Sequence, residues 1–165
     1  MMEPIDTVNP ELHYDRLAPA PAEARDQPVA QTAIERSQGQ RILIVDDEAA
    51  VADLIEAVLV DEGYTVAIAR DGVQGLLLAR DWKPDVVLMD IMLPGVDGTT
   101  AIRRLKADPA TADLPIVAMS AGRTIRRQSN ELTDADAALA KPFDIEALLA
   151  QIELLLSRRR NEAGA

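Results

Sequence analysis

Short runs of apolar residues alternate along this chain with segments whose apolar positions recur every three or four residues. Three of the runs, at residues 41–46, 86–90 and 116–120, are apolar along almost their whole length. Runs of this kind are typical of parallel strands that are buried on both faces. Two weaker strands are predicted at residues 64–69 and 137–141.

The segments between the strands have the spacing of helices with one apolar face. Helices are predicted over residues 49–62, 73–81, 99–106, 124–134 and 145 to about 158. Gly63 is placed to end the first helix in the left-handed conformation, and Asp144 is placed to cap the last one. The residues expected on the buried faces of the first two helices are Val51, Leu54, Ile55, Val58, Leu59, Val73, Leu76 and Leu77.

Strands that alternate with helices predict an α/β domain in which a doubly wound, five-stranded parallel sheet carries helices on both faces. This domain is expected to span residues 41–158, followed by a short tail at residues 159–165. Residues 1–40 are rich in proline and alanine and are expected to form a flexible extension. A small segment that docks on the domain or on a partner is the alternative for this region.

Charge and rare residue types exclude several classes of function. The net charge of −11 argues against a nucleic-acid-binding protein, which needs a basic face. The chain has no cysteine and one histidine, so disulfides, thiol catalysis and histidine-ligated metal sites are excluded. No apolar run reaches membrane-spanning length and no signal-peptide pattern is present, so a cytoplasmic protein without a membrane partner is expected.

Polar side chains stand where the predicted strands end: Asp46 and Asp47, then Asp90, Ser120 and Lys141. Ligand sites of open parallel sheets lie at the carboxyl ends of the strands, so these side chains are expected to meet at one edge. Carboxylates gathered there would repel one another until a cation neutralises them, and oxygen ligands suit Mg²⁺. Asp47 could instead be a helix cap, but that reading does not explain Asp90.

The same set of residues suits phosphoryl transfer. Asp90 is the best nucleophile, because a carboxylate can accept a phosphoryl group as an acyl phosphate. Mg²⁺ and the Lys141 ammonium can each neutralise a phosphoryl oxygen, and the Ser120 hydroxyl can donate to a third.

Four motifs in order resemble the receiver domain of two-component response regulators, over residues 41 to about 158. They are Val45-Asp46-Asp47-Glu48, Asp90-Ile-Met-Leu-Pro-Gly-Val-Asp-Gly98, Ser120-Ala121 and Lys141-Pro142-Phe143. The resemblance implies the flavodoxin-like strand order 2-1-3-4-5. It also implies a *cis* bond between Lys141 and Pro142.

The resemblance assigns a role to each site residue. It implies that Asp90 is the phosphoacceptor and that Asp46, Asp47, Asp90 and the backbone carbonyl of Met92 hold Mg²⁺. Lys141 would pair with phosphoryl oxygens and Ser120 would be the switch hydroxyl. The donor would be a phosphohistidine on a sensor histidine kinase or a histidine phosphotransfer protein.

The implied function is that of a stand-alone response regulator, which signals by a phosphorylation-dependent contact with a downstream protein or by a phosphorelay. Its only chemistry would be self-phosphorylation and autodephosphorylation. The chain departs from the family at Ala138, where an aromatic ring is usual, and at Asp134-Ala-Asp136, where Gly-Ala-Asp is usual. The alternatives are a phosphorylation-independent interaction module and a hydrolase with an aspartyl-phosphate intermediate. The hydrolase usually has a second acid two residues after its nucleophile, where this chain has Met92.

Overall fold

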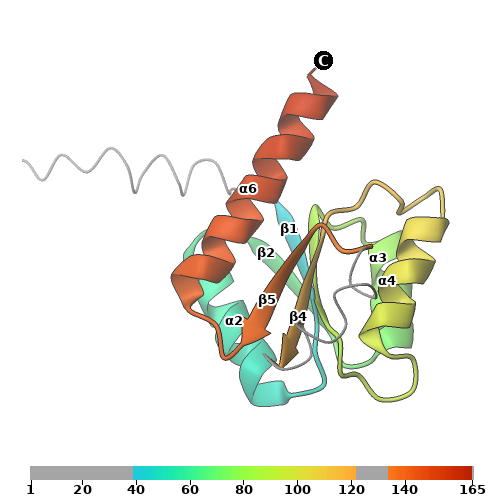
Figure 1. Ribbon diagram of the computed structural model, residues 1–165. Helices are drawn as coiled ribbons and strands as arrows, with labels where there is room; N and C mark the ends of the chain where they lie inside the picture. Colours follow the sequence, from blue (N-terminus) through green and yellow to red (C-terminus); the bar gives the residue numbers. More distant parts are fainter. Residues whose placement is uncertain (1–38, 122–133, 165) are drawn as a thin grey trace, which may run out of the picture.

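A computed structural model describes residues 39–121 and 134–164 and shows one sheet between two layers of helices (Figure 1). The strands are β1 (Arg41–Val45), β2 (Thr65–Ala69), β3 (Val86–Asp90), β4 (Ile116–Ala121) and β5 (Ala137–Lys141). The helices are α2 (Ala49–Asp61), α3 (Gly72–Asp81), α4 (Gly98–Ala107) and α6 (Ile145–Ala163). All strand pairs are parallel and the order is β2-β1-β3-β4-β5, which confirms the predicted fold class.

The two faces of the sheet carry different helices (Figure 1). Because successive side chains of a strand point to opposite faces, each central strand contributes to both cores. Ile42, Ile44 and Leu88 pack with α2 and α6 on one face. Leu43 and Met89 pack with α3 and α4 on the other. Burial on both sides explains why these strands are continuous apolar runs.

The predicted apolar faces of two helices are partly wrong. Leu54 on α2 and both Val73 and Leu77 on α3 are more than half exposed. In α3 the small residues face the sheet instead: a Cβ at Gly75 would lie 2.9 Å from the Val45 Cγ1 atom. This close approach of the helix to β1 rotates the larger side chains outward.

Other helix boundaries were predicted with mixed success. Gly63 has a φ of 89°, which confirms the left-handed end of α2. Asp144 occupies the cap position of α6, but its side chain makes no capping hydrogen bond. The prediction that α6 ends near Arg158 is wrong, because the helix continues to Ala163. Arg159 donates from Nη1 to the Asp85 carbonyl oxygen at 3.2 Å, which attaches this last part of the helix to the domain.

The helix predicted at residues 124–134 and the extension predicted at residues 1–40 lie largely outside the described residues. Asp134 itself is in a turn. In the part of the chain that the structure describes, no helix combines the length and the apolar character that crossing a membrane requires.

The hydrogen bond that caps α4 is expected to contribute to the stability of the domain, and this contribution can be measured. The Asp97 carboxylate accepts from the Thr100 backbone N–H at 2.8 Å, and this hydrogen bond is the main reason that the pKa of Asp97 lies below its ordinary value of 3.8. Asp97→Ala should lower the free energy of unfolding by about 1 kcal/mol at neutral pH. Because the folded-state pKa is the lower one, this contribution is present above the ordinary carboxyl pKa and is lost as the pH falls through the folded-state pKa.

Urea unfolding at neutral and acid pH measures this cost. Asp97→Asn is the matched control, because an amide oxygen still accepts the Thr100 hydrogen bond, and it should lose less stability at neutral pH. Equal losses in the two variants would show that the capping hydrogen bond does not stabilise α4.

Candidate functional site

The register of β1 and β3 brings two acids together at the carboxyl edge of the sheet. Val45 pairs with Met89, so the next residues, Asp46 and Asp90, lie side by side. Both are almost fully buried, at 0% and 3% exposure. Asp47 lies one residue further along, in the bend between β1 and α2, and is exposed.

Three carboxylates form one cluster at this edge. Oxygen atoms of Asp46, Glu48 and Asp90 lie within 4.8 Å of one another. Two backbone N–H groups orient the buried pair: Glu48 donates to Asp46 Oδ1, and Met92 donates to Asp90 Oδ1, each at 2.9 Å. Each buried carboxylate therefore has one oxygen fixed by the loop that follows its own strand.

Lys141 supplies the balancing charge from the end of β5. Its Nζ atom lies 2.8 Å from Asp46 Oδ2, 3.1 Å from Asp90 Oδ2 and 3.7 Å from Glu48 Oε1. The peptide bond that follows, between Lys141 and Pro142, is *cis*, as the resemblance implied. One ammonium thus faces three carboxylates, so the cluster keeps an excess of negative charge that a divalent cation would neutralise.

Burial and neighbouring charges change the pKa values of Asp90 and Lys141. Burial raises the pKa of the Asp90 carboxyl, and the Met92 hydrogen bond and the Lys141 charge oppose this shift only in part. Burial disfavours the Lys141 ammonium, but its hydrogen bond to Asp46 and its contacts with Asp90 outweigh that penalty and raise the pKa of Lys141. Lys141 therefore remains charged at neutral pH.

Ser120 lies near the end of β4, and its hydroxyl is buried. The residue is 1% exposed, and its Oγ atom finds no hydrogen-bond partner within residues 39–121 and 134–164. A buried hydroxyl without a partner is costly, so this atom is a candidate to bind a ligand. Its neighbour Ala121 pairs in register with Lys141, and β4 also pairs with β3, so Ser120 belongs to the same sheet edge as Lys141 and Asp90.

Two of the predicted metal ligands, Asp47 and the Met92 carbonyl, are not part of the carboxylate cluster. Asp47 is exposed and is not one of the three clustered carboxylates. Met92 is 67% exposed, and its backbone N–H donates to Asp90 Oδ1. The roles predicted for Asp47 and for the Met92 carbonyl stay predictions.

Glu48 was missed as a site residue, although it stands in the first motif. The available signal was its position two residues after Asp46, in the same run of three acids. Glu48 also occupies the cap position of α2, and the turn into that helix brings its carboxylate back toward Asp46 and Asp90.

Close packing fixes the backbone of the phosphoacceptor candidate. The Gly98 N–H donates to the Ile91 carbonyl at 3.0 Å. A Cβ at Gly98 would lie 2.0 Å from the Asp90 carbonyl oxygen and 2.6 Å from the Ile91 Cα. The start of α4 can therefore approach the end of β3 only because residue 98 is glycine.

The two departures from the family pattern lie on or beside β5. Ala138 is exposed on this strand. Asp136 connects the strand to its neighbours, because its Oδ2 atom accepts from the Ile116 N–H at 2.8 Å and from Lys106 Nζ at 2.9 Å. The turn at residues 134–136 departs from the family pattern at Asp134, but its last residue, Asp136, still provides a carboxylate that joins α4 and β4 to the start of β5.

The donor set fits Mg²⁺. All the clustered ligand atoms are carboxylate oxygens, two of the three carboxylates are buried, and the third opens to solvent, which would leave room for the waters that Mg²⁺ retains. Asp46, Glu48 and Asp90 form an acidic cluster of the kind that coordinates Mg²⁺ in receiver active sites.

Sequence comparison places this site among signalling proteins. The profile of the response regulator receiver domain matches residues 42–153. The chain is 43% identical over 119 residues to the DNA-binding dual master transcriptional regulator RpaA of *Synechocystis*, covering 72% of this chain and 49% of RpaA. It is 44% identical over 117 residues to the response regulator PleD of *Caulobacter vibrioides*, covering 70% of this chain and 26% of PleD. The chain spans about half or less of the length of these relatives.

Solved structures have the same fold. The receiver domain of the sensor histidine kinase PA1611 from *Pseudomonas aeruginosa*, solved with a magnesium ion in its active-site cleft, is 33% identical, with a TM-score of 0.67 over 72% of this chain and 98% of that one. A receiver domain protein from *Methanospirillum hungatei* is 31% identical, with a TM-score of 0.67 over 74% of this chain and 98% of that one. Motifs, strand order and acidic pocket agree with these comparisons, and the chain belongs to the response regulator receiver domain family.

Proposed function

We propose that this protein is a response regulator that accepts a phosphoryl group on Asp90 from a phosphohistidine of a sensor histidine kinase or a histidine phosphotransfer protein. The observation that carries the proposal is the pairing of a buried Asp90 carboxylate with Lys141, at a sheet edge that also holds the Ser120 hydroxyl, which has no hydrogen-bond partner among the described residues. A fixed nucleophile with a cation and a hydroxyl donor at the same edge is what phosphoryl transfer requires.

In the proposed reaction, a carboxylate oxygen of Asp90 forms a bond to phosphorus while the bond from phosphorus to the donor imidazole nitrogen breaks. The imidazole leaves with the electron pair of that bond and takes a proton from solvent. The Met92 N–H holds the other Asp90 oxygen, so the attacking oxygen is Oδ2, which now faces Lys141. Orientation of this kind lowers the barrier because little rearrangement is left for the reaction itself.

Lys141 and Ser120 have complementary proposed roles. The Lys141 ammonium would move from the carboxylates to a phosphoryl oxygen, where it neutralises charge as the new bond forms. The Ser120 hydroxyl would donate to another phosphoryl oxygen and so gain a partner that no described residue provides. Asp46, Asp47, Asp90 and the Met92 carbonyl are the proposed ligands of Mg²⁺, with Glu48 added by the structure. When bound, Mg²⁺ supplies positive charge to a phosphoryl oxygen.

We further propose that the phosphorylated protein acts in the cytoplasm through contact with a downstream protein or through a phosphorelay. Catalysis would be limited to its own phosphorylation and dephosphorylation. The names of RpaA and PleD describe whole regulators of which this chain matches about half or less, so their outputs are not assigned to it.

The test is incubation of the full chain with Mg²⁺ and acetyl phosphate, followed by intact mass spectrometry. We expect one phosphoryl group per chain, absent from Asp90→Asn and present in Asp61→Asn, which makes the same change at an exposed site on α2. Continued release of phosphate over many turnovers would indicate a hydrolase. No adduct on the unmodified chain would indicate a phosphorylation-independent module and would contradict the proposal.

A further inference from the structure

The outer face of α3 presents an apolar pair to solvent. Val73 and Leu77 are 54% and 57% exposed, and their four-residue spacing places them on the same side of the helix. Single exposed apolar residues are ordinary, but here one of the pair, Leu77, also lines a groove.

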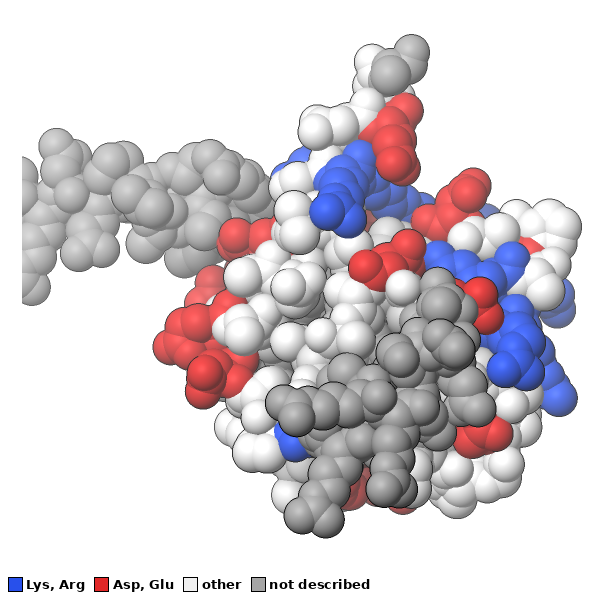
Figure 2. All heavy atoms as spheres, in the orientation of Figure 1, with Lys and Arg blue, Asp and Glu red and all other residues white. Residues whose placement is uncertain are grey.

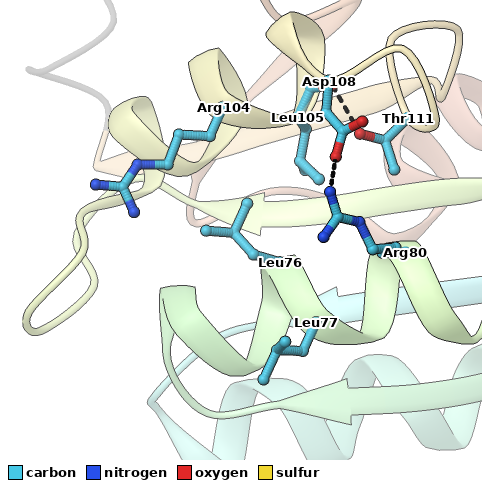
Figure 3. Close-up of a pocket in the computed structure, with 7 residues that line it drawn as sticks. All are labelled: Leu76, Leu77, Arg80, Arg104, Leu105, Asp108 and Thr111. Carbon is cyan, nitrogen blue, oxygen red and sulfur yellow. Dashed lines mark hydrogen bonds and ion pairs between the residues drawn. The ribbon is translucent and has the colours of Figure 1, made fainter.

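That groove lies between α3 and α4 and has a volume of about 210 Å³ (Figure 3). Leu76 and Leu77 of α3 and Leu105 of α4 provide its apolar lining. In Figure 3 the Arg80 side chain points toward Asp108, whereas the Arg104 side chain extends from α4 on the far side of Leu76 and points away from the other labelled residues. A ligand in the groove would therefore meet aliphatic carbon beside the Arg80 guanidinium, with the exposed Arg104 side chain at the rim.

The groove is basic on an acidic protein. The chain has a net charge of −11, yet Figure 2 shows basic side chains gathered over α4. Arg103 and Arg104 are exposed, and Arg104 makes no ion pair with any residue in the described ranges. Asp108 is the single acid among the lining residues, and it pairs with Arg80 through one nitrogen, which leaves other guanidinium N–H groups able to donate.

The groove is separate from the phosphoryl site. Arg80 is near the end of α3, which leads into the start of β3, whereas Asp90 is at the opposite end of that strand. Asp108 and Thr111 likewise lie between the end of α4 and the start of β4. A ligand bound in the groove would leave Asp90 accessible. The groove would therefore bind a second partner and would take no part in phosphoryl transfer.

We propose that the groove between α3 and α4 docks an acidic segment of a partner protein, with an aliphatic side chain on Leu76 and Leu77 and carboxylates on Arg80 and Arg104. Planar guanidinium groups match carboxylates in geometry and in charge. The aliphatic lining favours an acidic peptide over nucleic acid, because a peptide can place an apolar side chain against the leucines while its carboxylates meet the arginines.

The experiment is selection of a randomised peptide display library on the full chain, followed by binding measurements on the enriched peptides. We expect enrichment of peptides that combine several Asp or Glu residues with an aliphatic residue, and amide chemical-shift changes centred on α3 and α4. Arg104→Glu should weaken binding about tenfold, which corresponds to about 1.4 kcal/mol. Leu77→Ala should weaken it severalfold.

Matched variants elsewhere on the surface act as controls. Arg158→Glu makes the same charge change on α6, and Leu54→Ala makes the same truncation at an exposed leucine of α2; neither should alter binding. Asp90→Asn should also bind as well as the unmodified chain, so failure of the phosphorylation proposal would leave this result unchanged.

Several outcomes would overturn the proposal: no enrichment of acidic peptides, binding that survives Arg104→Glu, or shifts confined to another face. Light scattering tests whether a second copy of this chain occupies the groove, and titration with duplex DNA tests whether nucleic acid does. A change of oligomeric state in Arg104→Glu would show that a second copy fills the groove, and DNA binding that this variant abolishes would identify nucleic acid as the ligand.

Discussion

Lys141→Met should lower the free energy of unfolding by about 3 kcal/mol in metal-free buffer. The substitution removes the cation that lies 2.8 Å from Asp46 and 3.1 Å from Asp90, both of which are almost fully buried. Two adjacent carboxylates would then remain away from water without a balancing charge, which costs far more than the loss of an exposed ion pair. Urea unfolding with and without millimolar Mg²⁺ measures the loss, and Mg²⁺ should recover part of it.

Two controls separate this effect from general damage to the fold. Lys83→Met makes the same replacement at an exposed lysine and should change stability little. Asp90→Asn in the Lys141→Met background should recover stability, because it removes one of the unbalanced charges. A Lys141→Met protein as stable as the unmodified chain in metal-free buffer would show that the carboxylates are balanced by other means.

Gly98→Ala should both destabilise the domain and slow its phosphorylation. The new methyl group would lie 2.0 Å from the Asp90 carbonyl oxygen and 2.6 Å from the Ile91 Cα, and these backbone atoms cannot rotate away as a side chain could. Displacement of the backbone should cost about 1–3 kcal/mol of stability. Because Asp90 would move with it, the rate of phosphorylation by acetyl phosphate should fall by up to about a hundredfold.

Gly164→Ala is the matched control for this substitution. Its Cβ would lie 3.4 Å from the nearest atom, and its φ of −96° suits any residue, so neither stability nor rate should change. If Gly98→Ala lost stability but kept its phosphorylation rate, the close contact would support packing alone and would not position Asp90.

Much of the fold could be predicted from the sequence because the signals are local. Continuous apolar runs identified β1, β3 and β4, since strands buried on both faces admit little else. Gly63 marked the end of α2 because few other residues adopt a φ of 89° at low cost. The extent of α6 was underestimated because the contact that holds its last part joins Arg159 to Asp85, which is far away in the sequence.

The orientation of α3 could not be predicted from its apolar spacing. Periodicity favoured a buried face with Val73 and Leu77, whereas the helix approaches β1 so closely that it presents Gly75 and Ala79 to the sheet. The distance between helix and sheet is a tertiary property, and it decides whether small or large residues are buried. This same orientation creates the groove that carries the docking proposal.

By itself the sequence determined which chemistry stands at the strand ends, because Asp46, Asp90, Ser120 and Lys141 each stand at or next to the end of a recognisable strand, and parallel strands share one carboxyl edge. Only the tertiary structure decided which oxygens meet there. It brought Glu48 into the cluster and left Asp47 outside it, because the register of β1 on β3 and the turn into α2 depend on contacts between distant segments. Alternation along one strand is a local rule, whereas the distance between two carboxylates on different segments is set by how the whole sheet packs.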